Sequence, residues 1–254
     1  MKAPPLEGPD ALFVTQRSAP GEIGLSAFFK GKEDPVLNRY KQLRARGRAL
    51  NDLLIKQLPK TAIRECAKKL GLLEGKTLVL DSEHELSVLF DYCLYTHRRG
   101  NKTVIDRYLA QAPPAVLSEE DMRLLNAMSN AYYSLFVVDA VQTDKGVTLH
   151  DLIRDKTFFL MDTGLGQSAR PGLMLAGRVL PLADFAMSSG AFIPLQGTAV
   201  RHQVESILKK FQKHKKMGDV VFSPAQEAAF SAQVIRGLLR AGAFDMLMHR
   251  DVEC

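Results

Sequence analysis

The spacing of apolar residues changes at Tyr133, and this change constrains the fold more than any other feature of the chain. Between Asp34 and Ala131, apolar residues recur at the spacing of amphipathic α-helices. Beyond Tyr133, five short runs rich in Val, Leu, Phe and Thr have the character of β-strands. These runs are YSLFVVDAVQ, GVTLHDLIR, KTFFLMD, PGLMLAGRVLPL and DFAMSSGAFIPL. The pattern predicts helices followed by a separate block of strands.

The strand block has the size of a small barrel. Turn-forming residues separate its runs at 144–146, 155–156, 164–172 and 183–184. Gly177 lies inside the fourth run, where a barrel strand commonly bends. We predict an α+β protein with a helical N-terminal domain, a five-stranded small antiparallel β-barrel and C-terminal helices.

Capping signals and composition set the expected boundaries. Asp34 and Pro35 suit an N-cap and the first helical position. Later helices are preceded by three pairs of capping residues: Ser82 with Glu85, Ser118 with Asp121, and Ser223 with Gln226. The first 33 residues are rich in Pro and Gly and lack a period. The predicted parts are a flexible arm at 1–33, a helical domain at 34–131, the barrel at 132–197 and a helical pair at 198–254.

The composition is that of a soluble globular protein, with 46% apolar and 24% charged residues. No apolar run approaches the roughly 18–20 residues that a membrane span needs. The N-terminal stretch lacks the apolar core of a secretory signal. Three cysteines, Cys66, Cys93 and Cys254, are widely spaced and odd in number, which fits reduced thiols. We therefore expect a cytoplasmic protein with no membrane partner.

Asp162-Thr163-Gly164, preceded by apolar residues, resembles the catalytic triplet of retroviral-like aspartic proteases. In that family Ala or Ser follows the triplet and a later apolar-apolar-Gly strand brackets the site. Here Leu165 follows, and the later match at 234–237 has a helical pattern. We interpret the triplet as a turn after the third strand, with glycines favoured for positive φ.

Other polar groupings do not predict catalysis or metal binding. Cys93 and His97 are four residues apart on one helix, but structural zinc sites use paired short spacings, and Cys66 has no partner nearby in sequence. His150-Asp151 resembles half of an acid–base pair and is better explained by loop packing. Asp91, Asp106 and Glu83, with Arg98 and Arg99, are interpreted as solvated helix faces. We predict no catalytic residue, metal or cofactor.

Positive charge is concentrated in two helical segments. The net charge is +6, and residues 30–72 alone contain 12 Lys or Arg and 4 Asp or Glu. Lys and Arg clusters beside a small barrel are candidates for contact with nucleic acid, and solvated helix faces are the alternative. The candidate residues are Arg39, Lys41, Arg44, Arg46 and Arg48 in the first segment and Lys209, Lys210, Lys213, Lys215 and Lys216 in the second.

Residues 73–195 resemble a set of uncharacterised bacterial proteins. Two stretches carry the resemblance: LDSEHELSVLFDYCLYTHRRGNKTVIDRYLAQAPP, and YYSLFVVDAVQTDKGVTLHDLIRDKTFFLMDTGLGQSARPGLMLAGRVLPL. Some of those proteins resemble carriers of a Cys-rich SEC-C tail, but this chain ends MLMHRDVEC with one Cys, so no zinc is carried over. The resemblance implies a bacterial protein with a helical region and a small barrel, and it supplies no catalytic residue.

We therefore expect a non-enzymatic binding or adaptor module that contacts nucleic acid through its basic helices. Two alternatives stay open: an enzyme whose site assembles near the barrel mouth and His150, and a scaffold that binds only proteins. A pocket with converging His, Asp or Arg favours the enzyme, a continuous basic surface favours nucleic acid, and an exposed apolar patch favours a protein partner.

Overall fold

A computed structural model describes residues 34–111, 117–212 and 221–245, and gives no side chains for 210–212. The expected flexible arm at 1–33 lies outside these residues. The chain divides into a unit at 1–34 and a compact unit at 35–254. The described part of the second unit is an α+β structure that combines eight helices with a closed five-stranded barrel. The predicted fold class is confirmed.

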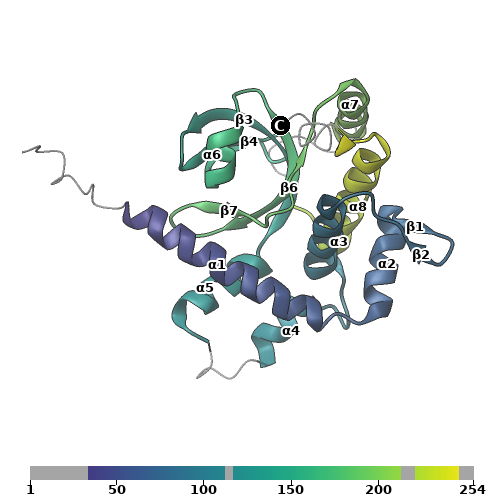
Figure 1. Cartoon of the computed structure of the whole chain (residues 1–254), viewed down its shortest axis with the longest axis horizontal. Coiled ribbons are helices and arrows are strands. Elements are labelled where there is room, and N and C mark those ends of the chain that lie inside the picture. Colours follow the sequence, from purple (N-terminus) through teal and green to yellow (C-terminus); the bar gives the residue numbers. More distant parts are fainter. Residues whose placement is uncertain (1–33, 112–116, 213–220, 246–254) are drawn as a thin grey trace, which may run out of the picture. The chain divides into compact units, whose positions relative to one another are not determined.

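Five helices precede the barrel (Figure 1). The pair Ser82 and Glu85 begins the third of them, since the Ser82 side chain accepts a hydrogen bond from the Glu85 backbone. Ser118 and Asp121 form a full capping box ahead of the fifth. The helices are α1 (Pro35–Lys56), α2 (Lys60–Leu70), α3 (Glu83–Thr96), α4 (Val104–Gln111) and α5 (Glu119–Ser129), and a small hairpin of β1 (Leu73–Glu74) and β2 (Thr77–Leu78) lies between α2 and α3.

Strand pairing closes the barrel in the order β3-β4-β5-β7-β6 and back to β3. Its strands are β3 (Tyr132–Gln142), β4 (Gly146–Asp151), β5 (Lys156–Met161), β6 (Met174–Pro181) and β7 (Ala186–Ser188). A further strand, β8 (Ile193–Pro194), pairs with β6, so the last predicted run supplies two short strands. Helices α7 (Thr198–Gln212) and α8 (Pro224–Arg240) follow.

The barrel is mixed, whereas a purely antiparallel one was expected. Four of its neighbouring pairs are antiparallel, but β5 and β7 run parallel, with Leu160 opposite Ala186. A closed ring with an odd number of strands cannot alternate direction throughout, because the last strand returns to the first with the same direction. Five strands therefore force one parallel pair.

Alternating side chains give the barrel two apolar faces. One face fills the interior with residues such as Phe136, Leu149, Leu160 and Leu175. Gly177 belongs to this face, and a Cβ there would lie 1.8 Å from Cδ1 of Phe192. The predicted bend residue therefore makes room for the Phe192 ring, which packs edge-on against Phe136 at 5.9 Å between ring centroids.

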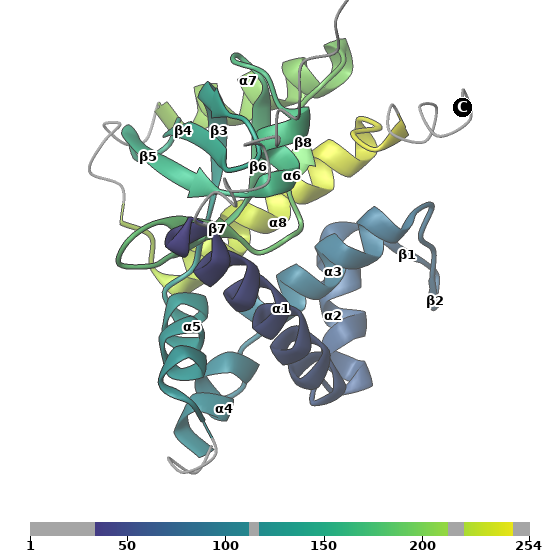
Figure 2. The ribbon, with the colours of Figure 1, turned by 60° about the vertical axis from the view of Figure 1, so that its left-hand side comes forward.

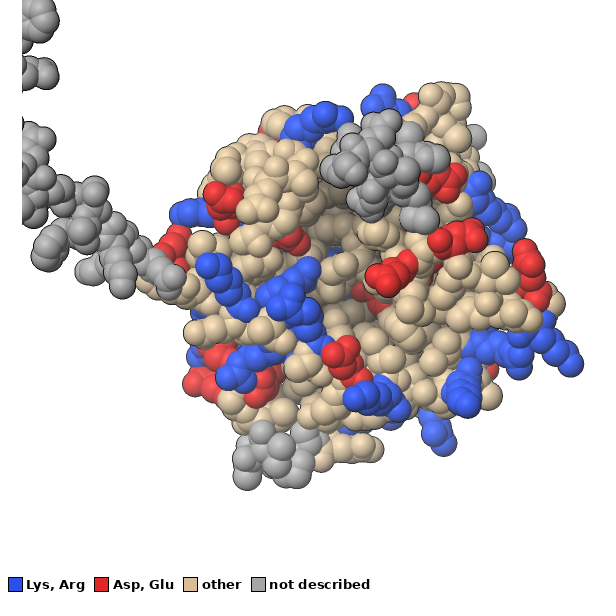
Figure 3. Space-filling model, in the orientation of Figure 1, with Lys and Arg blue, Asp and Glu red and all other residues tan. Residues whose placement is uncertain are grey.

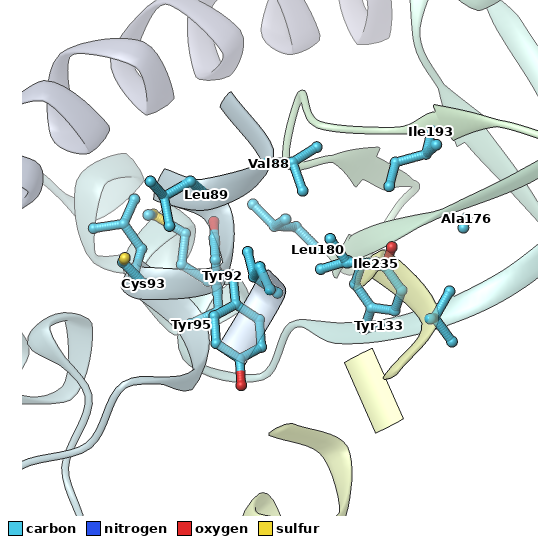
Figure 4. Close-up of a cluster of buried hydrophobic side chains, with 14 of the residues drawn as sticks. Val88, Leu89, Tyr92, Cys93, Tyr95, Tyr133, Ala176, Leu180, Ile193 and Ile235 are labelled. Carbon is cyan, nitrogen blue, oxygen red and sulfur yellow. The ribbon is translucent and has the colours of Figure 1, made fainter. Parts of the chain in front are cut away.

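The other face of the barrel packs against helices. Tyr133, Ala176 and Leu180 meet Tyr92 and Tyr95 of α3 and Ile235 of α8 in one buried cluster, which Figure 4 shows with its neighbours. Helix α8 contacts α2, α3, α7 and β3. Figure 2 shows α8 between the barrel and helices α2 and α3. A single core therefore joins the barrel to helices from both ends of the described chain.

Candidate functional site

Three of the five candidate cations on α1 are paired within the fold. Arg39 pairs with Asp184, and its Nε lies 3.6 Å from Oε1 of Glu120. Arg46 donates to Oδ1 of Asp121 at 2.7 Å. These contacts hold α1 against α5 and the loop before β7, so this charge is partly neutralised by the protein itself.

Arg44 belongs to a second network, which includes the aspartate of the triplet at 162–164. Arg44 donates through Nη1 to the Ser188 carbonyl at 2.6 Å, and its Nη2 lies 3.9 Å from Oδ2 of Asp162. The Ser188 hydroxyl donates to the same Asp162 oxygen at 2.7 Å. Asp162 thus connects α1 with the ends of β5 and β7.

The triplet begins a short helix, α6 (Thr163–Ser168), rather than the expected turn. Oδ1 of Asp162 accepts from the Leu165 backbone at 3.2 Å, which is an N-cap hydrogen bond. The glycines here do not adopt the expected positive φ. Gly166 is needed for close approach instead, because a Cβ would lie 2.9 Å from the Gly146 nitrogen. In this chain the carboxylate of Asp162 caps a helix.

The remaining candidate cations are less constrained where they are described. Lys41 and Arg48 of α1 and Lys209 of α7 are exposed, and none of the three makes an ion pair within the described residues. The side chain of Lys210 and the residues Lys213, Lys215 and Lys216 lie outside the description.

A groove of about 790 Å³ lies between α1, α3 and the loop that follows β7. Arg44, Arg48 and Lys56 of α1 line one wall, and Asp91 and Tyr95 of α3 line another. Apolar side chains such as Leu94, Leu124 and Met187 complete the lining. Figure 3 shows this face hollowed near its centre, with basic and acidic side chains on its borders. We call this feature the α1–α3 groove.

Three oxygens of residues that line the α1–α3 groove are buried without a hydrogen-bond partner. They are Oδ1 of Asn51, Oδ1 of Asp91 and Oγ of Ser189. Leaving such an atom unpaired costs about 1–3 kcal/mol. Ordered water or a bound polar group is the usual partner of such atoms.

Asp91 is held in place by a buried network. It is only 7% exposed, and its Oδ2 accepts from Nε of Arg178 at 3.1 Å. Arg178, itself 1% exposed, also donates to Oε1 of Glu227 on α8 at 3.0 Å and lies over the Tyr95 ring. The expectation that Asp91 belongs to a solvated helix face is wrong, because α3 turns that residue toward the barrel. Asp91 also has apolar neighbours at helical spacing, Val88, Leu94 and Tyr95, and these were the signal for its burial.

Burial and nearby negative charge raise the pKa values of two tyrosines, Tyr95 and Tyr40. Burial, reinforced by the negative charge of Asp91, raises the pKa of Tyr95. Burial also raises the pKa of Tyr40 on α1, and the negative charge of Asp162 raises it further. Both hydroxyls therefore stay protonated at neutral pH.

His150 and Asp151 do not pair with each other. Asp151 is buried inside the end of the barrel, where it accepts from Ser134 Oγ at 2.6 Å and from the Ile153 backbone at 2.9 Å. His150 points to the other face of β4, within 3.2 Å of Thr157 Oγ1. The arrangement is loop packing.

Cys66 has a spatial partner although it has none nearby in sequence. Its thiol lies within hydrogen-bonding reach of Cys93, and both residues are buried free thiols where α2 meets α3. This hydrogen bond and burial raise the pKa of Cys93. Within the described ranges, no group of three or more His, Cys, Asp or Glu residues has the arrangement of a metal site. None of the described helices is long and apolar enough to cross a membrane.

The described chain is an α+β protein with a mixed barrel and a groove beside it that polar and apolar side chains line. Residues 35–224 match the model of a family of unknown function, DUF7986, so the chain belongs to that family. This match provides no link to proteins with a SEC-C tail. No curated protein and no solved structure matches the chain.

Proposed function

We propose that the protein is a binding module whose α1–α3 groove takes a small anionic ligand that also carries hydrogen-bond donors. The observation that carries this proposal is the unpartnered Oδ1 of Asp91, a buried carboxylate oxygen in a groove with cations at its rim. Ligand sites are typically apolar clefts of about 300–1,000 Å³ with a few convergent polar groups. The α1–α3 groove fits that description.

The charges of the groove set the orientation of the ligand. Arg48 and Lys56 are exposed at the rim, whereas Asp91, Leu94 and Tyr95 are buried. An anionic group therefore fits beside the rim cations. The inner oxygens of Asn51 and Asp91 can only accept hydrogen bonds, so the inner end of the ligand must donate them. A nucleoside monophosphate with an amino group on its base combines both ends.

Paired probes test the proposal. Adenosine 5′-monophosphate, adenosine and inorganic phosphate are titrated by calorimetry and by the shift of the melting temperature. We expect the monophosphate to bind more tightly than either part. If none of the three stabilises the protein at millimolar concentration, the proposal is wrong.

Variants then separate the two ends of the groove. Arg48→Gln with Lys56→Gln should weaken monophosphate binding about tenfold, which corresponds to about 1.4 kcal/mol. Adenosine binding should be unchanged, because adenosine lacks the phosphate that these cations contact. Asn51→Leu should weaken both. Lys41→Gln is the matched control, because Lys41 is exposed on the same helix and does not line the groove.

The nucleic-acid role expected from the basic helices is a second candidate. It is favoured by the exposed Lys41, Arg48 and Lys209, whose charges have no ion-pair partner within the described residues. It is weakened by the internal pairing of Arg39, Arg44 and Arg46. Replacing Lys41 and Arg48 with Gln should then flatten the salt dependence of oligonucleotide binding.

The two other hypotheses have less support. His150 and Asp151 have separate partners, and the carboxylate beside His150 is that of Asp155, whose Oδ1 lies 3.4 Å from His150 Nε2. The large exposed apolar residues of the described chain come from separate elements and loops. They are Val36 and Leu53 of α1, Leu78 of β2, and Val79 and Val221. We also propose that the protein is bacterial, that it is located in the cytoplasm, and that it is related to proteins with a SEC-C tail.

A further inference from the structure

A second and larger cleft, of about 1250 Å³, lies between α2, α3 and α8. It shares no lining residue with the α1–α3 groove. Its cations come from separate parts of the chain: Lys69 from α2, Arg98 from the loop after α3, and Arg236 and Arg240 from α8. We call it the α8 cleft. None of these residues is among the ten candidate nucleic-acid contacts named from the sequence.

The cations of the α8 cleft outnumber its carboxylates. Glu65 is the acidic residue among the lining residues, and it lies 3.8 Å from His97. Arg98 pairs with Asp106 at 3.5 Å. Lys69, Arg236 and Arg240 are exposed and form no ion pair with any described residue. The cleft therefore has a net positive charge that the described protein leaves unbalanced.

His97 lies in the cleft near charges of both signs. Burial is the main cause that lowers its pKa; Glu65 raises the pKa, and the smaller effects of Lys69 and Arg107 lower it. The imidazole is therefore neutral at pH 7, and the positive charge of the cleft comes from its Lys and Arg residues.

The shape of the cleft fits an extended ligand. Its α8 residues recur every three to four positions from Pro224 to Arg240, which places them along one face of the helix. A helix of 17 residues is about 25 Å long. Alanines, including Ala225, Ala228 and Ala232, form the part of this face between its ends, so a chain can approach the helix closely. Arg236 and Arg240 then lie one turn apart at one end.

We infer that the α8 cleft binds a chain of phosphates, and specifically the backbone of a single-stranded nucleic acid. Lys69, Arg236 and Arg240 are three exposed cations that line one cleft, and several cations in one cleft match a ligand with repeated negative charges. The only aromatic side chain besides His97 in the lining is Tyr92, which is buried and donates to the Ala228 carbonyl at 3.1 Å. Bases therefore find no exposed stacking partner among the lining residues, and contact is independent of sequence.

The test is fluorescence anisotropy with a labelled single-stranded oligonucleotide of mixed sequence, titrated over a range of salt concentrations. Each phosphate contact to a single strand contributes a slope of about −0.7 in log affinity against log salt. Arg236→Gln with Arg240→Gln removes two cations, so we expect the slope to flatten by about 1.4. Both residues are exposed, so we expect the variant to keep its fold, which melting curves would check.

Controls identify the surface and the source of the phosphates. Arg123→Gln, exposed on α5 and outside both clefts, should leave the slope unchanged. The inference is overturned if the α8 variant keeps the wild-type slope, or if only Lys41→Gln with Arg48→Gln flattens it. Binding of tripolyphosphate without binding of the oligonucleotide would also overturn it, in favour of free polyphosphate. The nucleoside monophosphate titration of the α1–α3 groove is independent of every one of these outcomes.

Discussion

Nε of Arg178 lies 3.1 Å from Oδ2 of Asp91, and both side chains are almost completely closed to solvent. The pair joins β6 of the barrel to α3, and Glu227 extends it to α8. Glu227 also accepts from the Tyr133 backbone at 2.9 Å. One buried cation therefore connects three parts of the fold that are far apart in sequence.

Removing this cation should destabilise the protein strongly. Arg178→Met leaves the buried Asp91 and the half-buried Glu227 without their partner, and breaking a buried pair costs about 3–5 kcal/mol. The free energy of unfolding in urea measures the loss. Arg123→Met is the control, since it breaks exposed ion pairs with Glu119 and Glu120 that contribute about 0–1 kcal/mol. Similar losses in the two variants would contradict the structural role of Arg178.

Gly177→Ala should destabilise the barrel because the new methyl group meets the Phe192 ring. Overpacking of this kind costs about 1–3 kcal/mol. Chemical denaturation measures the loss, and Phe192→Leu in the same chain should restore part of it. Gly47→Ala serves as a control in the α1 helix, where the added methyl has room and should stabilise the protein by about 0.5–1 kcal/mol.

The capping box at Ser118 should make stability depend on acid pH. Hydrogen bonds from Ser118, together with Arg46, lower the pKa of Asp121 despite partial burial. A carboxyl group with a depressed pKa in the folded state stabilises the protein above its unfolded value of about 3.9, and the contribution disappears as pH falls through the folded value. Asp121→Asn should therefore destabilise the protein at pH 7 by about 1 kcal/mol and have little effect near pH 2. A loss that is equal at both pH values would contradict this origin.

Cys66 and Cys93 should resist alkylation while the protein is folded. Both thiols are buried, which keeps the reagent away from them. The pKa of Cys93 is also raised, so little Cys93 thiolate is present. Mass spectrometry after iodoacetamide treatment should show modification of these two residues only in denaturant. Elemental analysis should show no stoichiometric zinc, and zinc that is lost in Cys93→Ser would contradict this expectation.

Local sequence patterns predicted the elements well and their contacts poorly. Capping at Ser118 and Ser223 and the alternation in the strand runs depend on residues close in sequence, and the structure contains them. The parallel β5–β7 pair follows from closure of an odd-stranded ring, which no single run of residues encodes. Closure itself requires β3 and β6 to meet across about 40 residues.

The candidate sites were harder to predict for the same reason. Arg44 was identified, but its partners Asp162 and Ser188 are more than 100 residues away. Asp91 was assigned to the surface because a carboxylate on a helix is usually solvated, and its partner Arg178 lies in a strand. The α8 cleft draws its cations from α2, from the loop after α3 and from α8, so no single basic cluster marks it in the sequence.

The position of α8 has a consequence for biosynthesis. This helix is translated after every strand of the barrel, yet it supplies Glu227 to Arg178 and covers the joint between the barrel and α3. In a nascent chain that ends before Glu227, the guanidinium of Arg178 has Asp91 as its acidic partner but lacks Glu227. The apolar surface of α3 that α8 covers is then exposed. Assembly of the core therefore requires a helix that is synthesised after all the strands of the barrel.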